Sequence, residues 1–260
     1  MEETVLKNKT SDNKFNILSS DNAVSVATGD NKTEEWTDEK ADAVPDYVLK
    51  QSKLKYKWYL FFKRAFDIVF SGLAILLLIW LYLILAIIVK CSDGGSVFYR
   101  HCRVGKNGKP IKVAKFRSMR KDADNLVSSL TPEQLELYKK EYKMDGDPRI
   151  TRLGGFLRRT SLDELPNLFS VFCGKISLVG PRPLMETEVY DKYGENAQKL
   201  LSVKPGMVGW WAVNGRNSRT YDSGERQQLE LYYVDNCSVW LDIKILFKAI
   251  GCVFKRTGAQ

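Results

Sequence analysis

The feature that most constrains this chain is an uncharged apolar run of 22 residues from Ile68 to Val89. About 20 such residues in a helix cross the hydrocarbon core of a bilayer. The segment before it, 56–66, alternates aromatic side chains with lysine and arginine, a composition typical of the lipid headgroup boundary. We therefore predict a membrane-anchoring segment over residues 48–92. The alternative is the buried core helix of a soluble protein.

The charges around this run leave its topology open. Lysine and arginine are frequent on both sides of it, and positive residues favour the cytoplasmic side of a membrane. A single-pass helix cannot place both flanks there, whereas a re-entrant helix can. A re-entrant helix needs a break, however, and the middle of the run, 78–81, has neither proline nor glycine.

Charge divides the chain into two regions. Residues 1–47 hold 5 Lys/Arg against 11 Asp/Glu and little apolar sequence, so we predict a disordered polar tail. The remainder carries a net charge of +15, which indicates an anionic partner such as nucleic acid, a phospholipid surface or a phosphorylated substrate. The five cysteines form no CxxC pair and there is one histidine, His101, so neither a zinc site nor a disulfide framework is expected.

Three further segments have recognisable patterns. Two strand-like runs, 97–104 and 111–117, flank an Asn-Gly turn and predict a β-hairpin. Residues 131–144 are typical of a polar amphipathic helix. The apolar segment 239–254 carries two lysines four residues apart, and could lie in the membrane surface or pack against the domain core.

The densest polar sequence combines arginines with two carboxylates. It comprises residues 147–152, 158–166, which include Asp163 and Glu164, and the Pro-Arg-Pro turn around Arg182. Arginine presents a fork of donors that matches phosphate oxygens, so this density favours diphosphate recognition. Two structural alternatives stay open: Ser161 and Glu164 also have the spacing of a helix capping box, and Pro-Arg-Pro also suits a plain surface turn.

At these residues the chain resembles the bacterial sugar transferase family, the monotopic phosphoglycosyl transferases that begin exopolysaccharide and capsule assembly. The resemblance covers about residues 63–257. Its motifs occur in order as KRAFDI at 63–68, VFYR at 97–100, RVG at 103–105, KFRSM at 115–119, DPRITR at 147–152, TSLDELP at 160–166, SLVGPRP at 177–183, KPG at 204–206 and VNGR at 213–216.

The resemblance implies an α+β fold in which a membrane helix, re-entrant or single-pass, precedes a mainly helical cytoplasmic catalytic domain at 93–260 with a small β-hairpin. It implies a transferase of the inner membrane that moves a phosphosugar from a UDP-sugar to polyprenol (undecaprenyl) phosphate and releases UMP. The carboxylate matching Asp163 would be the nucleophile; an ionised aspartate needs no general base.

The implied site residues are few. Asp163 and Glu164 are the expected catalytic pair and the expected ligands of Mg²⁺. The residues expected to bind substrate phosphate are Lys115, Arg117, Arg149, Arg158, Arg182, Asn214 and Arg216. The expected partners are UDP-sugar, polyprenol phosphate, membrane phospholipid and a second copy in a homodimer, without nucleic acid. The alternative function is a non-catalytic membrane adaptor that binds anionic lipid in a glycan-assembly complex.

Overall fold

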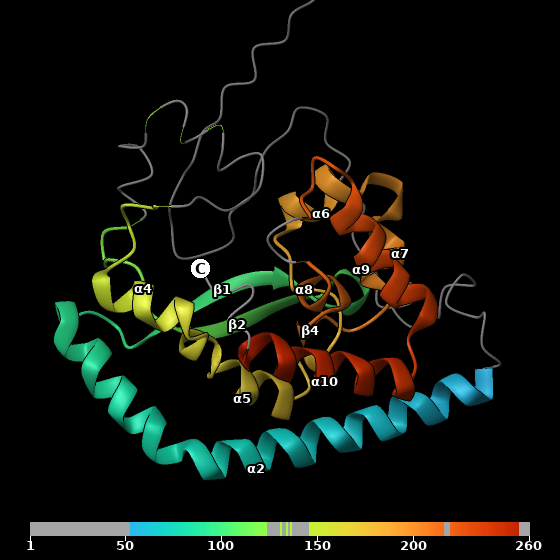
Figure 1. Cartoon of the computed structure of the whole chain (residues 1–260), viewed down its shortest axis with the longest axis horizontal. Helices are drawn as coiled ribbons and strands as arrows, with labels where there is room; N and C mark the ends of the chain where they lie inside the picture. Colours follow the sequence, from blue (N-terminus) through green and yellow to red (C-terminus); the bar gives the residue numbers. More distant parts are fainter. Residues whose placement is uncertain are drawn as a thin grey trace, which may run out of the picture.

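The computed structural model describes residues 53–123, 131, 134, 136, 146–215 and 219–254. The predicted tail, most of the predicted helix at 131–144, and Arg216 lie outside the described residues. Within them, helices surround two small two-stranded sheets, so the predicted α+β class and the hairpin are confirmed (Figure 1).

The predicted membrane helix is one continuous helix, α2 (Lys53–Asp93), which runs along one side of the domain (Figure 1). It is the one helix among the described residues that is long and apolar enough to cross a membrane. Its outward face is exposed and apolar: Leu76 is 72% exposed and Leu77 is 71% exposed. Since water disfavours so much exposed apolar surface, this face is suited to contact lipid.

The opposite face of α2 packs against the domain in both halves of the helix. Near its start Tyr59 is buried and donates a hydrogen bond to Asp242 at 3.1 Å. Near its end Tyr82 is buried and donates to the backbone oxygen of Leu165 at 2.6 Å. Both halves of α2 therefore contact the same folded unit.

The predicted hairpin consists of β1 (Phe98–Val104) and β2 (Pro110–Phe116), which pair antiparallel with Phe98 opposite Phe116. The turn between them contains a short 3₁₀ segment, η2 (Lys106–Gly108). Asn107 and Gly108 adopt left-handed conformations with φ of 56° and 77°. Asparagine and glycine tolerate this region best, which is why the Asn-Gly pair predicted the turn.

After the hairpin the chain forms α4 (Arg152–Arg159), η4 (Leu162–Glu164) and α5 (Asn167–Phe172). Thr151 begins α4 by accepting a hydrogen bond from the backbone of Gly154 at 2.8 Å. A Cβ on Gly154 would lie 1.8 Å from the backbone oxygen of Ser118. Glycine therefore allows α4 to approach the segment that follows β2.

A second sheet positions the Pro-Arg-Pro turn. Its strands, β3 (Ser177–Val179) and β4 (Gly206–Val208), are parallel. They are linked by α6 (Glu186–Tyr193), η5 (Gly194–Asn196) and α7 (Ala197–Leu201). A Cβ on Gly206 would lie 2.1 Å from the backbone nitrogen of Gly180, so the chain segments can meet there because both residues are glycine.

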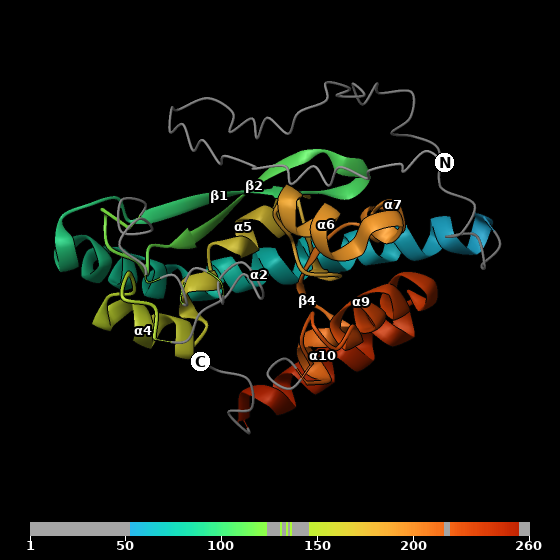
Figure 2. The same cartoon turned by 90° about the horizontal axis from the view of Figure 1, so that it is seen from above.

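The C-terminal part consists of α8 (Trp210–Val213), α9 (Glu225–Asn236) and α10 (Val239–Phe254). Figure 2 shows α9 and α10 on the side of the molecule opposite the hairpin. In α10, Leu241 and Ile245 are buried in the main core cluster, whereas Trp240 and Phe247 are 77% and 72% exposed. Packing against the core is thus confirmed for one face, while the other face stays apolar and exposed.

Candidate active site

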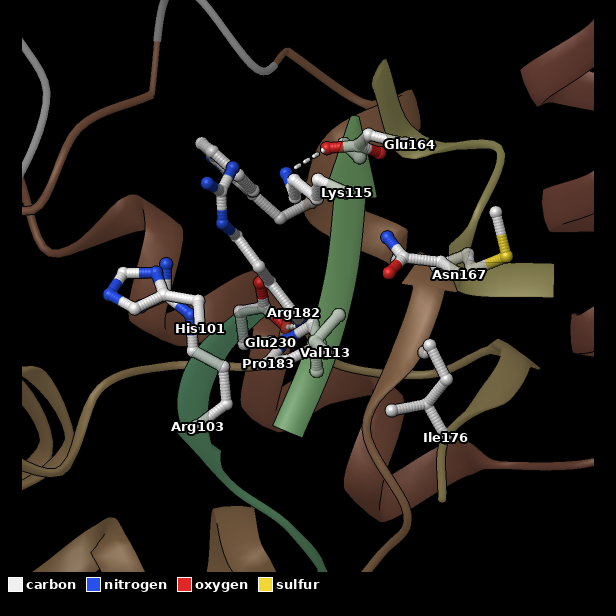
Figure 3. A pocket seen from close by; sticks show the side chains of 15 residues that line it. His101, Arg103, Val113, Lys115, Glu164, Asn167, Ile176, Arg182, Pro183 and Glu230 are labelled. Carbon is white, nitrogen blue, oxygen red and sulfur yellow. Dashed lines mark hydrogen bonds and ion pairs between the residues drawn. The ribbon is translucent and has the colours of Figure 1, made fainter. Parts of the chain in front are cut away.

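A pocket lies between the hairpin, the β3–β4 sheet and α9 (Figure 3). Its walls carry basic, carboxylate and amide side chains. The lining residues are His101, Arg103, Val113, Lys115, Glu164, Asn167, Ile176, Arg182, Pro183, Gly206, Met207, Gly209, Trp211, Ala212 and Glu230. Among the predicted site residues, Lys115, Glu164 and Arg182 therefore meet at one cavity.

The carboxylate pair stands at one end of this pocket. Lys115 Nζ lies 2.7 Å from Glu164 Oε1, with both side chains about a third exposed (Figure 3). Asp163 is buried beside them, 6% exposed. Burial raises the pKa of Asp163 above its usual value, and the charge of Glu164 adds to that rise, whereas Lys115 and Arg158 act to lower it.

The two carboxylates do not lie in an α-helix. They belong to the 3₁₀ turn η4, and Ser161 before it has a φ of 56° and makes no side-chain capping hydrogen bond. The capping-box alternative is therefore wrong; the α-helix begins only at Asn167. A left-handed serine costs about 1–3 kcal/mol, and such conformations cluster at functional sites.

Arg158 lies beside the carboxylate pair through α4. Its Nε donates to Ser118 Oγ at 2.9 Å, which fixes the guanidinium next to the end of β2. The same guanidinium is close enough to Asp163 to affect the pKa of that carboxyl. The predicted Arg158 is thus placed to neutralise charge at Asp163.

Arg149 has a different environment. Its guanidinium forms a buried ion pair with Asp147, with Nη2 to Oδ2 at 2.7 Å and Nε to Oδ1 at 2.9 Å. Two parallel hydrogen bonds of this kind hold the planar group firmly. The guanidinium of Arg149 is therefore paired with Asp147, and this pair stabilises the turn before α4.

The other end of the pocket is strongly basic. In Figure 3 the side chain of Arg182 extends toward Lys115, and His101 and Arg103 lie beside it on β1. Burial and the charges of Arg103, Lys115 and Arg182 lower the pKa of His101 to about 4. His101 is therefore neutral near pH 7, and the cluster has the excess positive charge that attracts phosphate.

Two acidic residues that the sequence analysis missed support this basic end. Glu188 on α6 accepts hydrogen bonds from Tyr221 at 2.7 Å and Arg226 at 3.2 Å. Glu230 on α9 is 1% exposed and lines the pocket. Their sequence context is an ordinary polar helix, and only the fold brings Glu230 to the pocket and Glu188 within 3.9 Å of Arg103.

Trp211 forms one wall of the pocket. Its ring nitrogen donates to the backbone oxygen of Arg219 at 2.9 Å, and the guanidinium of Arg226 lies 4.2 Å from its ring centroid. Arg226 also lies 3.8 Å from the ring centroid of Tyr221. Such cation–π contacts fix the orientation of the tryptophan, which presents an apolar surface beside polar groups.

The remaining predicted residues lie away from the pocket lining. Arg117 donates to Ser96 at 3.4 Å, next to Gly95. Asn214, at the end of α8, donates to the backbone oxygen of Trp210 at 2.7 Å and accepts from Lys248 at 2.6 Å. These contacts connect Asn214 to α10.

The described residues contain no group of three or more His, Cys, Asp or Glu side chains that could hold a metal ion. The pair of Asp163 and Glu164 fits another mode of binding. Mg²⁺ commonly binds one or two carboxylates and completes its shell with substrate phosphates and water. The pair therefore fits a magnesium ion that arrives with a diphosphate.

The fold and the pocket together define a class of protein: a membrane-associated domain with a basic pocket beside two carboxylates. The model of the family described as "Bacterial sugar transferase" matches residues 58–256. The chain therefore belongs to the bacterial sugar transferase family.

Individual relatives agree with that family. The chain is 43% identical over 202 residues to a UDP-galactose-lipid carrier transferase of Erwinia amylovora, covering 76% of this chain and 42% of the relative. It is 40% identical over 200 residues to exopolysaccharide production protein ExoY of Rhizobium meliloti, covering 76% and 87%. It is 42% identical over 213 residues to an undecaprenyl-phosphate galactose phosphotransferase of Salmonella typhimurium, covering 80% and 44%. The chain thus spans less than half the length of the Erwinia and Salmonella relatives.

Proposed function

We propose that this protein transfers a phosphosugar from a UDP-sugar to undecaprenyl phosphate and releases UMP, as a first membrane step of exopolysaccharide or capsule assembly. The observation that carries the proposal is the juxtaposition of buried Asp163 with Glu164 and Lys115 at the end of a basic pocket. The names of the relatives supply the substrates: a lipid carrier, undecaprenyl phosphate and a UDP-activated galactose.

In the first step a carboxylate oxygen of Asp163 attacks the phosphorus that bears the sugar. The bond between that phosphorus and the oxygen bridging to UMP breaks, and the electron pair leaves with UMP. Asp163 must be ionised for this attack. Lys115 and Arg158 counter the burial that raises its pKa, because both positive charges favour the carboxylate form.

In the second step an oxygen of the lipid phosphate attacks the same phosphorus, and the bond to Asp163 breaks. The phosphosugar is then bonded to the lipid phosphate, and the carboxylate of Asp163 is free again. Arg182 and Lys115 stabilise the charge of the phosphates during both steps. Asp163 and Glu164 would hold Mg²⁺, whose positive charge would reduce the repulsion between the carboxylate and the diphosphate.

Helix α2 supports a position for the lipid substrate. Its outward face is apolar, and its inner face contacts the domain near the carboxylates through Tyr82 and Leu165. We place this face in the cytoplasmic membrane, with the catalytic domain on the cytoplasmic side. The lipid phosphate then approaches along the membrane surface.

The test is UMP release by the purified protein with undecaprenyl phosphate, Mg²⁺ and a panel of UDP-sugars. We expect release with at least one UDP-hexose, and a loss of about a thousandfold or more in Asp163→Asn and Asp163→Ala. Asp222→Asn, an exposed aspartate, is the matched control and keeps the native rate. Native rates in the Asp163 variants would refute the assignment. Vesicle binding without turnover of any donor would favour the adaptor.

A further inference from the structure

The fully buried carboxyl of Glu230 on α9 has no role in the proposed chemistry. One of its oxygens, Oε2, accepts a hydrogen bond from the backbone N–H of Arg182 at 3.2 Å. The other, Oε1, is buried and has no hydrogen-bond partner among the described residues. A buried acceptor left unpaired destabilises the folded protein, so the presence of this one calls for an explanation.

Nearby glycines leave room for Glu230 to pack beneath the Pro-Arg-Pro turn. A Cβ on Gly209 would lie 2.9 Å from the backbone oxygen of Gly180 and 3.8 Å from Glu230 Oε2. Proline on each side of Arg182 leaves the chain without a backbone N–H at 181 and 183. The N–H of Arg182 is therefore the one backbone donor in the Pro-Arg-Pro triplet, and it donates to Glu230.

The charged and titratable groups beside Glu230 come from three elements. Arg182 faces it from the turn after β3, Arg226 from its own helix, and Glu188 and Tyr193 from α6. Burial raises the pKa of Glu230 to about 7, and the two arginines act against that rise. Both its protonated and its ionised forms are thus populated near neutral pH.

We propose that Glu230 is a positioning residue for donor binding: it holds the backbone of Arg182 so that the guanidinium reaches the diphosphate of the UDP-sugar. The proposal rests on the proposed function. Positioning needs only the oxygen that accepts from Arg182, which both forms of the carboxyl offer. The negative charge of the ionised form opposes the incoming diphosphate, so binding favours the protonated form.

The sign of the pH dependence follows. Because the bound diphosphate raises the pKa of Glu230, binding takes up a proton, and donor affinity falls as the pH rises through about 7. Neither arginine nor the diphosphate of a UDP-sugar titrates between about pH 6 and pH 8. His101, with its pKa near 4, also stays neutral over that range.

The experiment measures the dissociation constant of a UDP-sugar with Mg²⁺ by calorimetry at about pH 6 and pH 8. An Asp163→Asn background prevents transfer. With Glu230 intact, the constant should rise by up to about tenfold between the two pH values, the limit for one linked proton whose pKa in the free protein is about 7. Glu230→Gln keeps the accepting oxygen without the charge, and should bind as tightly as intact Glu230 at pH 6 and more tightly at pH 8.

Glu230→Leu removes the oxygen and should bind about fivefold more weakly at pH 6, the loss expected for one hydrogen bond to a neutral acceptor, since the carboxyl is mostly protonated there. Glu225→Gln, exposed on the same helix, is the control and should match the parent. A pH dependence that persists in Glu230→Gln overturns the proposal, even if Glu230→Leu fails to fold. So does unchanged affinity in a folded Glu230→Leu. UMP release by the wild type tests the proposed function separately.

Discussion

Lys115 Nζ lies 2.7 Å from Glu164 Oε1, so the lysine is salt-bridged to the more exposed carboxylate of the pair. Buried Asp163 is affected by the same lysine, whose charge lowers its pKa. One cation therefore serves both carboxylates: it holds Glu164 in place and helps to keep Asp163 ionised. This relationship makes the pH dependence of the reaction a test of the site.

Removing this cation should shift the acid limb of the pH–rate profile. Asp163 must be ionised to act, and Lys115 lowers its pKa, so Lys115→Met raises that pKa. Activity is then lost at a higher pH as the solution is acidified. The measurement is the rate of UMP release against pH. Lys112→Met, exposed on the same strand, is the control. If the wild type, Lys115→Met and Lys112→Met all lost activity at the same acidic pH, the assignment would be contradicted.

The single histidine offers a direct probe of the pocket. We expect His101 to titrate near pH 4, because burial and three neighbouring cations disfavour its charged form. A bound diphosphate offsets the charges of Arg103, Lys115 and Arg182, so UDP-sugar should raise the midpoint. Nuclear magnetic resonance of the imidazole measures both values. A midpoint of about 6.5, its ordinary value, that UDP-sugar leaves unchanged would place His101 outside the pocket.

A buried polar cluster joins α2 to α10 and should be costly to break. Lys63 Nζ lies 2.6 Å from Asp242 Oδ2, and Tyr59 and Tyr233 donate to the same carboxylate at 3.1 and 2.8 Å. Asp242→Ala leaves the lysine charge largely buried and should reduce the free energy of unfolding by about 3 kcal/mol. Denaturant unfolding measures the loss. Glu225→Ala, exposed on α9, should change it by less than about 0.5 kcal/mol.

The two ends of α2 should lie on the same side of the membrane, since both halves of the helix pack on one domain. In a cysteine-free background, single cysteines at Lys55 and Lys121, both exposed, should react with an impermeant thiol reagent from the same side. Residue 121 follows the hairpin, so its labelling reports the side of the membrane on which the domain lies. Labelling from opposite sides would show instead that α2 spans the bilayer.

The elements predicted well are those that local physics determines. The hairpin followed from Asn107 and Gly108, whose conformation the turn requires, and α10 from its apolar pattern. The capping box did not form because Ser161 adopts a left-handed conformation and the helix begins later, at Asn167. A three-residue pattern cannot distinguish those two backbones.

The site was only partly predictable. Lys115, Glu164 and Arg182 were expected from arginine- and carboxylate-rich motifs and meet at the pocket. The predicted roles of these three residues, like those of Asp163, Arg158 and the outlying residues, stay predictions. Glu188 and Glu230 were missed because acidic residues on polar helices are common; their importance comes from burial, which depends on contacts between distant segments.

The double role of α2 has a practical consequence for anyone who wishes to work without detergent. The obvious step would be to delete the whole of α2. However, its residues Tyr82, Leu85 and Val89 belong to the same hydrophobic cluster as Phe116 and Leu157. A truncated protein that starts after residue 93 would expose that cluster beside the carboxylates. Redesigning the outward residues of α2 as polar ones, while keeping its inner face, is the route to a water-soluble form that retains the pocket.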